Sequence, residues 1–183
     1  DLYGVTGDVD HLAFALDLAR VIEAEFWDPE AGTVYFTPES GEQLVARPQE
    51  LTDQSTPSSL GVATNLLLDL AHFTTDDAFG AIAETVLSTH ADRIRGNPLE
   101  HVSLVLAAGK HTRGATELTL VADDVPDPWW DELAETYLPA PVLAPRPATQ
   151  EGLSEWLATL ELDEAPPIWR GRDSENGDPT VYA

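Results

Sequence analysis

The chain has 183 residues, and 33 Asp and Glu against 9 Lys and Arg give it a formal net charge of −24. This length suffices for one domain, or two small ones, with a buried core. The charge argues against nucleic acid as a partner, because too few cations are present to neutralise a run of phosphates, and against an anionic membrane surface. No apolar run is long enough to span a bilayer. Without cysteine the chain has no disulfide, thiolate metal site or Cys nucleophile.

Acidic residues are interspersed along the whole chain and do not form one acidic tail. Eight of the nine basic residues are arginines, and Lys110 is the only lysine. A diffuse acidic coat with almost no lysine is typical of cytoplasmic proteins of extreme halophiles, in which molar salt screens the repulsion between carboxylates. The pattern predicts a halophilic, archaeal and cytoplasmic protein whose fold loosens in dilute salt. The alternative is an ordinary acidic domain that binds a basic partner.

The first predicted helix covers residues 8–26, where apolar residues recur every three or four positions. Asp8 is its expected N-cap, and Asp28 before Pro29 ends it, because proline disfavours the helical conformation in the preceding residue. Two β-prone stretches separated by a Pro-Glu-Ser-Gly turn then predict a small hairpin or extended excursion near residues 32–47.

Three further helices follow this excursion. The second helix is predicted over residues 59–73, and the third begins at Asp76 or Asp77 and ends at Gly96. An Asn-Pro pair then supplies an N-cap and a first-turn proline for a fourth helix over residues 99–108. That helix is apolar nearly all round, so we expect it to be well buried. The short connection makes the third and fourth helices antiparallel neighbours.

After Gly114 the chain alternates between strand and helix patterns. The predicted elements are a strand at 117–122, a helix at 127–137, a strand at 141–144 and a helix at 150–160. Strand, helix and strand in this order predict a parallel pair joined by a crossover. The tail from Pro166 is rich in Gly, Pro and Asp, and we expect it to be loosely held except where Trp169 and Tyr182 dock.

Several short strings occur in the order and spacing of one known family. They are Leu2-Tyr3 with Thr6-Gly7-Asp8, Phe26-Trp27-Asp28, Gly32 with Tyr35-Phe36-Thr37, Arg47-Pro48 leading to Asp53, Pro57-Ser58, and the ending Pro179-Thr180-Val181-Tyr182-Ala183. Together they resemble the YyaL-like family of thioredoxin-domain-containing proteins, whose vertebrate members are called spermatogenesis-associated. The chain departs from the family at Leu60 and Gly61, where the family tends to have Asn and Ser.

The resemblance implies a mainly α fold. Residues 1–111 would form antiparallel helical hairpins of a partial α/α toroid, similar to six-hairpin glycosidases and to N-acylglucosamine 2-epimerase, with the β-hairpin excursion near residues 32–47. Residues 112–183 would form a small α/β appendage, a βαβα lobe, with an irregular tail. The chain would then be the C-terminal part of a longer protein. Its partners would include the thioredoxin-like domain and the first part of the toroid, and no cofactor or metal site is expected.

The loop before the second helix carries candidate ligand-binding residues, Asp53 and Ser58. Loops at one end of a toroid build its cleft, so these side chains could bind sugar hydroxyls, and Asp53 could act as acid or base. The alternative is that they cap the helix. Trp27 and Tyr35 flank the excursion beside it, where aromatic rings could stack on a sugar; the alternative is packing under the hairpin.

Four further residues are candidates. Arg47 could clamp an anionic ligand, or pair with one of the many acids. Among the five histidines, only His101 on the fourth helix is a candidate catalytic residue, and its alternative is a hydrogen-bonded core His. Asp123 and Asp124 end the first strand of the lobe, where open α/β sheets bind ligands. No Gly-rich phosphate loop follows them, which favours a structural cap instead.

Three functions remain open on this basis. The first is a module that recognises a carbohydrate-like small ligand together with the thioredoxin-like domain. The second is a sugar epimerase, isomerase or glycoside hydrolase of the toroid type, and the third is a scaffold. A large exposed apolar helix face would mark a severed interface. A closed pocket holding Asp53, Trp27 and a histidine would favour the enzyme.

Overall fold

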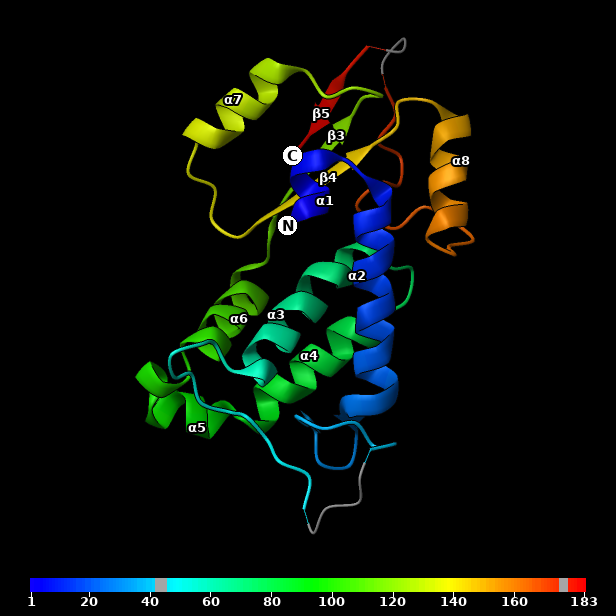
Figure 1. The fold of residues 1–183 in the computed structure, drawn as a ribbon. Coiled ribbons are helices and arrows are strands. Elements are labelled where there is room, and N and C mark those ends of the chain that lie inside the picture. The colour runs from blue at the N-terminus through cyan, green and yellow to red at the C-terminus, as the bar shows by residue number, and fades with distance from the viewer. Residues whose placement is uncertain (42–45, 175–177) are drawn as a thin grey trace. The chain divides into compact units, whose positions relative to one another are not determined.

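The computed structural model describes residues 1–41, 46–174 and 178–183. Over these residues the chain forms eight α-helices and two small β-sheets (Figure 1). The prediction of a mainly helical chain with a smaller β part is therefore confirmed. No helix in these ranges is long and apolar enough to cross a lipid bilayer.

The chain divides into two compact units, which we name the sheet unit and the helical unit. The sheet unit comprises Asp1–Leu16, His72–Thr75 and Ala115–Ala183. The helical unit comprises Asp17–Ala71 and Asp76–Gly114. The sequence predicted a division after residue 111, which lies close to the boundary at Gly114. The prediction placed Asp1–Leu16 with the helical part, whereas this segment belongs to the sheet unit.

The sheet unit is built on a three-stranded sheet with the strand order β4-β3-β5. The central strand β3 (Thr116–Val121) pairs in parallel with β4 (Pro141–Arg146) and antiparallel with β5 (Thr180–Tyr182). The predicted parallel pair is thus confirmed, and β5 was not foreseen. Helix α7 (Asp127–Glu135) connects β3 to β4, and α8 (Gln150–Thr159) follows β4.

An aromatic cluster holds the termini of the chain onto this unit. The buried ring of Tyr3, in α1 (Leu2–Thr6), packs on Phe73 and Trp156, and its hydroxyl donates to the Pro145 carbonyl. Trp169 packs on the same two rings and is fully buried. Large aromatic surfaces of this kind dominate core energetics. The expected docking of the tail at Trp169 and Tyr182 is therefore confirmed, since Trp169 is buried in this cluster and Tyr182 pairs with Thr119 in β5.

The helical unit consists of short helices and one small hairpin. Its elements are the end of α2 (Val9–Val21), a π-helical turn (Ile22–Phe26), β1 (Trp27–Asp28), β2 (Thr33–Val34), α3 (Ser59–Leu70), a 3₁₀ turn (Ala71–Phe73) that continues into the sheet unit, α4 (Ala78–Thr89), α5 (Ala91–Gly96), a second 3₁₀ turn (Pro98–Glu100) and α6 (Val102–Arg113). Helix α3 packs against both α4 and α6. Its fully buried Leu60 and Leu67 are seven residues apart and therefore lie on one side of the helix.

The structure confirms the first predicted helix, because α2 and the π-helical turn together reach Phe26. As expected, Asp8 caps this helix: its Oδ1 accepts a hydrogen bond from the Asp10 N–H at 3.0 Å. The third predicted helix is wrong in one respect, since it breaks at His90. The buried His90 ring lies 2.9 Å from the Thr33 hydroxyl, and this hydrogen bond ties the break to β2.

The hairpin differs from the predicted one, because β2 pairs with β1 at Trp27 and Asp28. The second β-prone stretch, residues 43–47, lies largely outside the described residues. The predicted all-round burial of the fourth helix is also wrong, since Val105 and Leu106 of α6 are exposed. Helices α3 and α4 both contact α6, but they leave Val105 and Leu106 at the surface.

Candidate functional site

Asp53 lies at the centre of a hydrogen-bonded cluster in the helical unit. Its Oδ1 accepts hydrogen bonds from the Ser58 N–H at 2.7 Å and the Ser103 hydroxyl at 2.6 Å, and its Oδ2 accepts one from the Ser103 N–H at 2.7 Å. A carboxylate has about four acceptor sites, so three are already used within the chain. The side chain joins the N-terminal ends of α3 and α6.

Ser58 and Ser103 complete this cluster. The Ser58 hydroxyl caps α3 by accepting a hydrogen bond from the Gly61 N–H at 3.1 Å, and it lies 3.0 Å from the Ser103 hydroxyl. A Cβ on Gly61 would lie 1.8 Å from the Ser103 Oγ, so only glycine allows α6 to approach this closely. Ser103 was not predicted as a member of this cluster, and the glycine at position 61, in the first turn of α3, was the signal for a close helix contact.

The protonation of Asp53 also suits a structural role. Burial raises the pKa of Asp53, but the hydrogen bonds from Ser103 and Ser58 together outweigh this effect and hold its pKa below the ordinary value. A carboxylate stabilised in its ionised form is a poor general acid or base near neutral pH. The structure therefore places Asp53 and Ser58 at a helix junction.

His101 is buried at the same junction. Its Nδ1 is 2.8 Å from the Leu51 carbonyl, and the next residue in the chain begins α6. The Asp53 N–H donates to the Glu100 carbonyl at 2.8 Å, so main-chain and side-chain bonds hold the same loop. The environment of His101 is therefore that of a hydrogen-bonded core histidine.

The aromatic candidates lie apart from this cluster. Trp27 is half-buried in β1, and the Arg47 guanidinium lies 4.4 Å from the centre of the Tyr35 ring. Arg47 also donates to the carbonyls of Glu25 and Thr37, at 3.0 and 2.8 Å, which fixes its direction. Over the described parts of the chain, no hydrogen bond or ring contact joins these side chains to Asp53. No group of three acidic or His residues in those parts could hold a metal ion.

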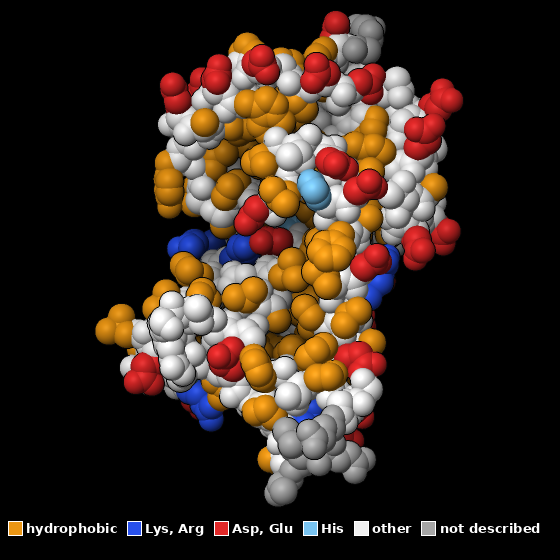
Figure 2. All heavy atoms as spheres, in the orientation of Figure 1, with side chains coloured by type: hydrophobic (Ala, Val, Ile, Leu, Met, Phe, Trp, Pro, Cys, Tyr) orange, Lys and Arg blue, Asp and Glu red, His pale blue; other side chains and the backbone are white. Residues whose placement is uncertain are grey.

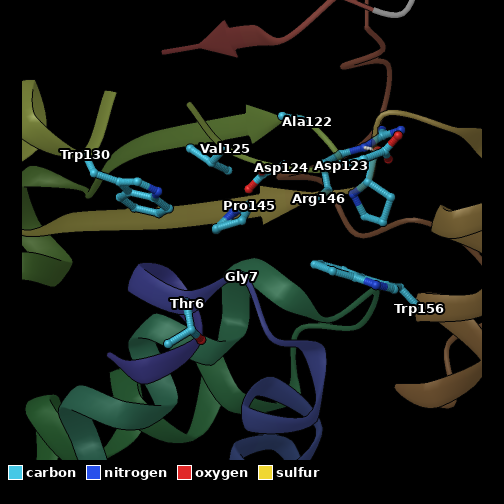
Figure 3. A pocket seen from close by; sticks show the side chains of 11 residues that line it. Thr6, Gly7, Ala122, Asp123, Asp124, Val125, Trp130, Pro145, Arg146 and Trp156 are labelled. Atoms are coloured by element: carbon cyan, nitrogen blue, oxygen red, sulfur yellow. Dashed lines mark hydrogen bonds between the residues drawn. The ribbon is translucent and has the colours of Figure 1, made fainter. Parts of the chain in front are cut away.

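A cavity in the sheet unit offers a more open site. It has a volume of about 220 Å³ and lies at the carboxyl ends of the parallel strands β3 and β4 (Figure 3). Its lining includes Asp123, Asp124, Trp130, Pro145, Arg146 and Trp156. We name it the strand-end cavity. Ligands of open α/β sheets bind at this edge, because the loops that leave the strands surround it.

Two tryptophans stand at the two ends of the lining in the view of Figure 3. Trp130 comes from α7 and is half-buried, whereas Trp156 comes from α8 and is fixed by ring contacts to Tyr3 and Trp169, with centroid distances of 6.2 and 6.0 Å. The Trp129-Trp130 pair in the predicted helix was a signal for this site that sequence analysis did not use.

The two carboxylates of the strand-end cavity differ in their bonding. Asp123 Oδ1 accepts a hydrogen bond from the Ala148 N–H at 3.0 Å, which joins the loops that follow β3 and β4. Asp124 is exposed, and it makes no hydrogen bond within the described ranges. Asp124 is therefore the carboxylate that can accept hydrogen bonds from a ligand.

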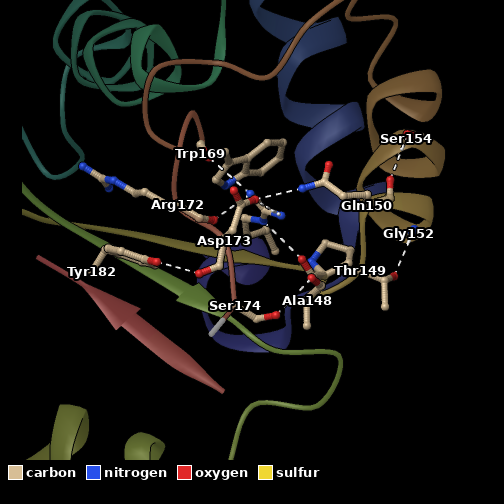
Figure 4. A network of polar contacts seen from close by, with 12 residues as sticks. Ala148, Thr149, Gln150, Gly152, Ser154, Trp169, Arg172, Asp173, Ser174 and Tyr182 are labelled. Atoms are coloured by element: carbon tan, nitrogen blue, oxygen red, sulfur yellow. Dashed lines mark hydrogen bonds and ion pairs between the residues drawn. The ribbon is translucent and has the colours of Figure 1, made fainter. Parts of the chain in front are cut away.

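Arg146 forms the rigid base of this region. Its side chain is 1% exposed, and the guanidinium donates to the carbonyls of Pro147 at 3.1 Å, Trp169 at 3.2 Å and Arg172 at 2.7 Å. Figure 4 shows two of these acceptor residues, Trp169 and Arg172, beside Asp173. Burial lowers the pKa of Arg146, and the nearby Asp173 carboxylate, 3.7 Å from Nη2, opposes this shift. An arginine side chain stays charged despite this shift. Its hydrogen bonds to the carbonyls of Trp169 and Arg172 therefore fix the C-terminal tail beside Arg146.

No family model matches the chain. The chain is similar to the uncharacterized protein B0495.5 of Caenorhabditis elegans, with 26% identity over 124 residues. The matched segment covers 67% of this chain but 17% of the nematode protein. The match therefore spans only a small part of the nematode protein.

Proposed function

We propose that the chain is a recognition module for a small, neutral, polyhydroxylated ligand of the carbohydrate type, bound in the strand-end cavity. The observation that supports this is the combination of Trp130 and Trp156 with the exposed carboxylate of Asp124 around one opening. Tryptophan presents a large apolar face with a polar N–H, which suits the C–H face and hydroxyls of a sugar ring. An ionised carboxylate accepts strong hydrogen bonds from hydroxyls.

The size and charge of the cavity narrow the ligand class. Its volume of about 220 Å³ is below the ~300 Å³ at which sites for drug-sized ligands begin, so it suits a single ring and not an oligosaccharide chain. The carboxylates of Asp123 and Asp124 and the net charge of −24 repel anions. The guanidinium of Arg146, which also lines the cavity, is buried and already donates to three carbonyls. Neutral sugars are therefore expected to bind better than sugar phosphates.

We also propose, on the resemblance of its sequence strings, that the chain is the C-terminal region of a YyaL-like thioredoxin-domain-containing protein. The helical unit would be an arc of an α/α toroid. The packing of α3 against α4 and α6 supports this proposal, as does the much greater length of the nematode relative. The coding sequence upstream of Asp1 tests it. A thioredoxin-like domain encoded there supports the proposal, and an unrelated upstream sequence overturns it.

The ligand proposal is tested by thermal unfolding in molar salt with a neutral hexose, an N-acetylated amino sugar and a hexose phosphate. A ligand at 100 times its Kd stabilises the folded state by about 2.7 kcal/mol, which corresponds to roughly 5–10 °C in Tm for a chain of this size. We expect a shift with one of the neutral sugars and none with the phosphate.

Trp130→Ala and Trp129→Ala provide matched variants, because both side chains are half-buried on α7 and only Trp130 lines the cavity. Trp130→Ala is expected to abolish the ligand-induced shift, and Trp129→Ala to retain it. Equal shifts in both variants, or no response of the wild type to any sugar, would overturn the proposal.

A further inference from the structure

The two helices that supply tryptophans to the strand-end cavity are held to the sheet unit in different ways. Helix α8 buries Leu153, ends at the buried Leu160, and carries Trp156 with its two ring contacts. Helix α7 buries none of its nine side chains, and Trp129 and Trp130 are only half-buried. Helix α7 therefore has much less buried apolar surface to stabilise its position.

Hydrogen bonds fix the two ends of the α7 segment but not its middle. Residues 124–138 form no hydrogen bond, ion pair or ring contact with the rest of the chain, within the ranges that the structure describes. At one end, Asp123 accepts a hydrogen bond from the Ala148 N–H at 3.0 Å. At the other end, the Ala140 carbonyl accepts one from the Thr116 N–H at 3.3 Å. The segment between these two anchors can move without breaking a bond to the sheet unit.

The same segment is uniformly acidic. Figure 2 shows Asp and Glu side chains, and no Lys or Arg, over the region of α7. Residues 124–138 contain no basic residue, and their acids are Asp124, Asp127, Asp131, Glu132 and Glu135. In a chain with a net charge of −24, this segment is repelled by the rest of the molecule.

No arginine of the sheet unit pairs with this segment, over the described residues. Arg146 donates to three carbonyls, Arg170 pairs with Glu164 at 2.9 Å, and Arg172 pairs with Glu117 at 3.1 Å. The repulsion on α7 is therefore offset by salt alone. The screening length falls from about 10 Å in dilute salt to about 3 Å in molar salt, so molar salt removes most of the repulsion.

We propose that residues 124–138 form a lid on the strand-end cavity, which closes in molar salt and opens by charge repulsion in dilute salt. The structure shows the closed position, in which Trp130 lines the cavity. Movement of the segment about its two anchors carries the Trp130 ring away and leaves Trp156 behind. Lids of this kind commonly control access to binding sites. The inference rests on the proposed function only for what the cavity binds.

Distances between pairs of spin labels test the lid. The chain has no cysteine, so labels can be attached at chosen residues. Ala134→Cys in α7 with Ala158→Cys in α8 forms the lid pair, and Ala158→Cys with Val181→Cys in β5 forms the control pair; all three side chains are exposed. On transfer from molar to dilute salt, the lid pair should shift to longer and more broadly distributed distances. The control pair should keep one narrow distribution.

Two double variants test whether charge repulsion causes the shift. Asp131→Asn with Glu135→Gln removes two exposed charges from α7, and Glu151→Gln with Glu155→Gln removes two exposed charges from α8 at the same spacing. The α7 variant is expected to reduce the shift of the lid pair in dilute salt, and the α8 variant to retain it. Equal shifts in the two variants would overturn the role of the charges on α7.

Hydrogen exchange in molar salt is an independent check, because it does not require the fold to survive dilute salt. The α7 amides should exchange at least about tenfold faster than those of α8, because α7 can open while the rest of the sheet unit stays folded. Equal protection of the two helices would overturn the proposal, as would a lid pair that does not respond to salt. If the control pair also shifts in dilute salt, the exchange rates decide.

No sugar is present in these measurements. A failure of the lid would therefore leave the proposed sugar site standing, and an absence of sugar binding would leave the lid standing.

Discussion

Asp53 in the helical unit and Asp124 in the sheet unit are both carboxylates in loops that precede a helix, but the chain uses them differently. Asp53 accepts three hydrogen bonds from Ser58 and Ser103, each 2.7 Å or shorter. Asp124 accepts none within the described ranges and opens on a cavity beside Trp130. A carboxylate whose acceptor sites are used by its own helices stabilises the fold, whereas an unused one remains available to a ligand.

The comparison shows why residue type alone could not select the site. The chain has 33 acidic residues, and Ser58 beside Asp53 suggested a polar cleft as strongly as Asp123 beside Asp124 did. The distinction lies in Ser103, which is far along the sequence and reaches Asp53 only because Gly61 lets α6 approach α3. Helix packing thus decides which carboxylate is saturated.

The largest expected effect follows from removing the saturated carboxylate. Asp53→Ala should lower the free energy of unfolding by about 3 kcal/mol, because the Ser103 and Ser58 N–H groups at two helix ends lose a charged acceptor. Denaturant unfolding in molar salt measures this, with Asp124→Ala as control. The assignment of Asp53 to the fold fails if the two variants are equally stable.

The same variant has a defined pH dependence. Folding lowers the pKa of Asp53, so the folded state favours the ionised form. This contribution is complete above the unfolded-state pKa near 4 and is lost as pH falls through the lower folded-state pKa. The difference in stability between the wild type and Asp53→Ala should therefore be constant from pH 7 to about 5 and shrink below about 4. A constant difference down to pH 2 would contradict this.

A smaller effect is expected from Gly61→Ala, which alters the packing on which the cluster depends. The new Cβ would lie 1.8 Å from the Ser103 Oγ and 2.5 Å from the Ser103 Cβ, so α3 and α6 must separate. Overpacking of this kind costs about 1–3 kcal/mol. Gly96→Ala is the matched control, because a Cβ there meets nothing within 4 Å. Equal stability of the two variants would show that the helices are not in close contact.

Local sequence signals predicted most of the fold. The Ser58 cap, the start of α2 after Asp8 and the parallel pairing of β3 with β4 all follow from periodicity and capping chemistry. Long-range contacts explain what was missed. The break at His90 depends on a hydrogen bond to Thr33, and β5 forms only because the tail returns to β3. Neither partner can be identified from a local pattern.

The strand-end cavity could be predicted only in part, because some of its residues also meet through long-range packing. Asp123 and Asp124 follow a recognisable strand, and strand ends of parallel sheets are general ligand positions. The tryptophans of the strand-end cavity come from two different helices, so their convergence depends on where α7 and α8 pack. The exposure of Val105 and Leu106 in α6 could not be predicted either, because an apolar helix pattern predicts burial on every side.

The smallest expected change in stability concerns Asp124, the carboxylate of the strand-end cavity. Asp124→Asn keeps the shape of the side chain and removes its charge, and since Asp124 is exposed, stability should change by no more than about 0.5 kcal/mol. Sugar binding should weaken by about tenfold, because hydrogen bonds to a charged acceptor are worth about 1.5–3 kcal/mol and neutral ones less. Asp131→Asn, an exposed acid of α7 outside the cavity, should leave affinity unchanged, as titration calorimetry in molar salt can show. Equal losses of affinity in both variants would point to the general acidic charge, whereas a loss confined to Asp124→Asn assigns the hydrogen bond to this carboxylate.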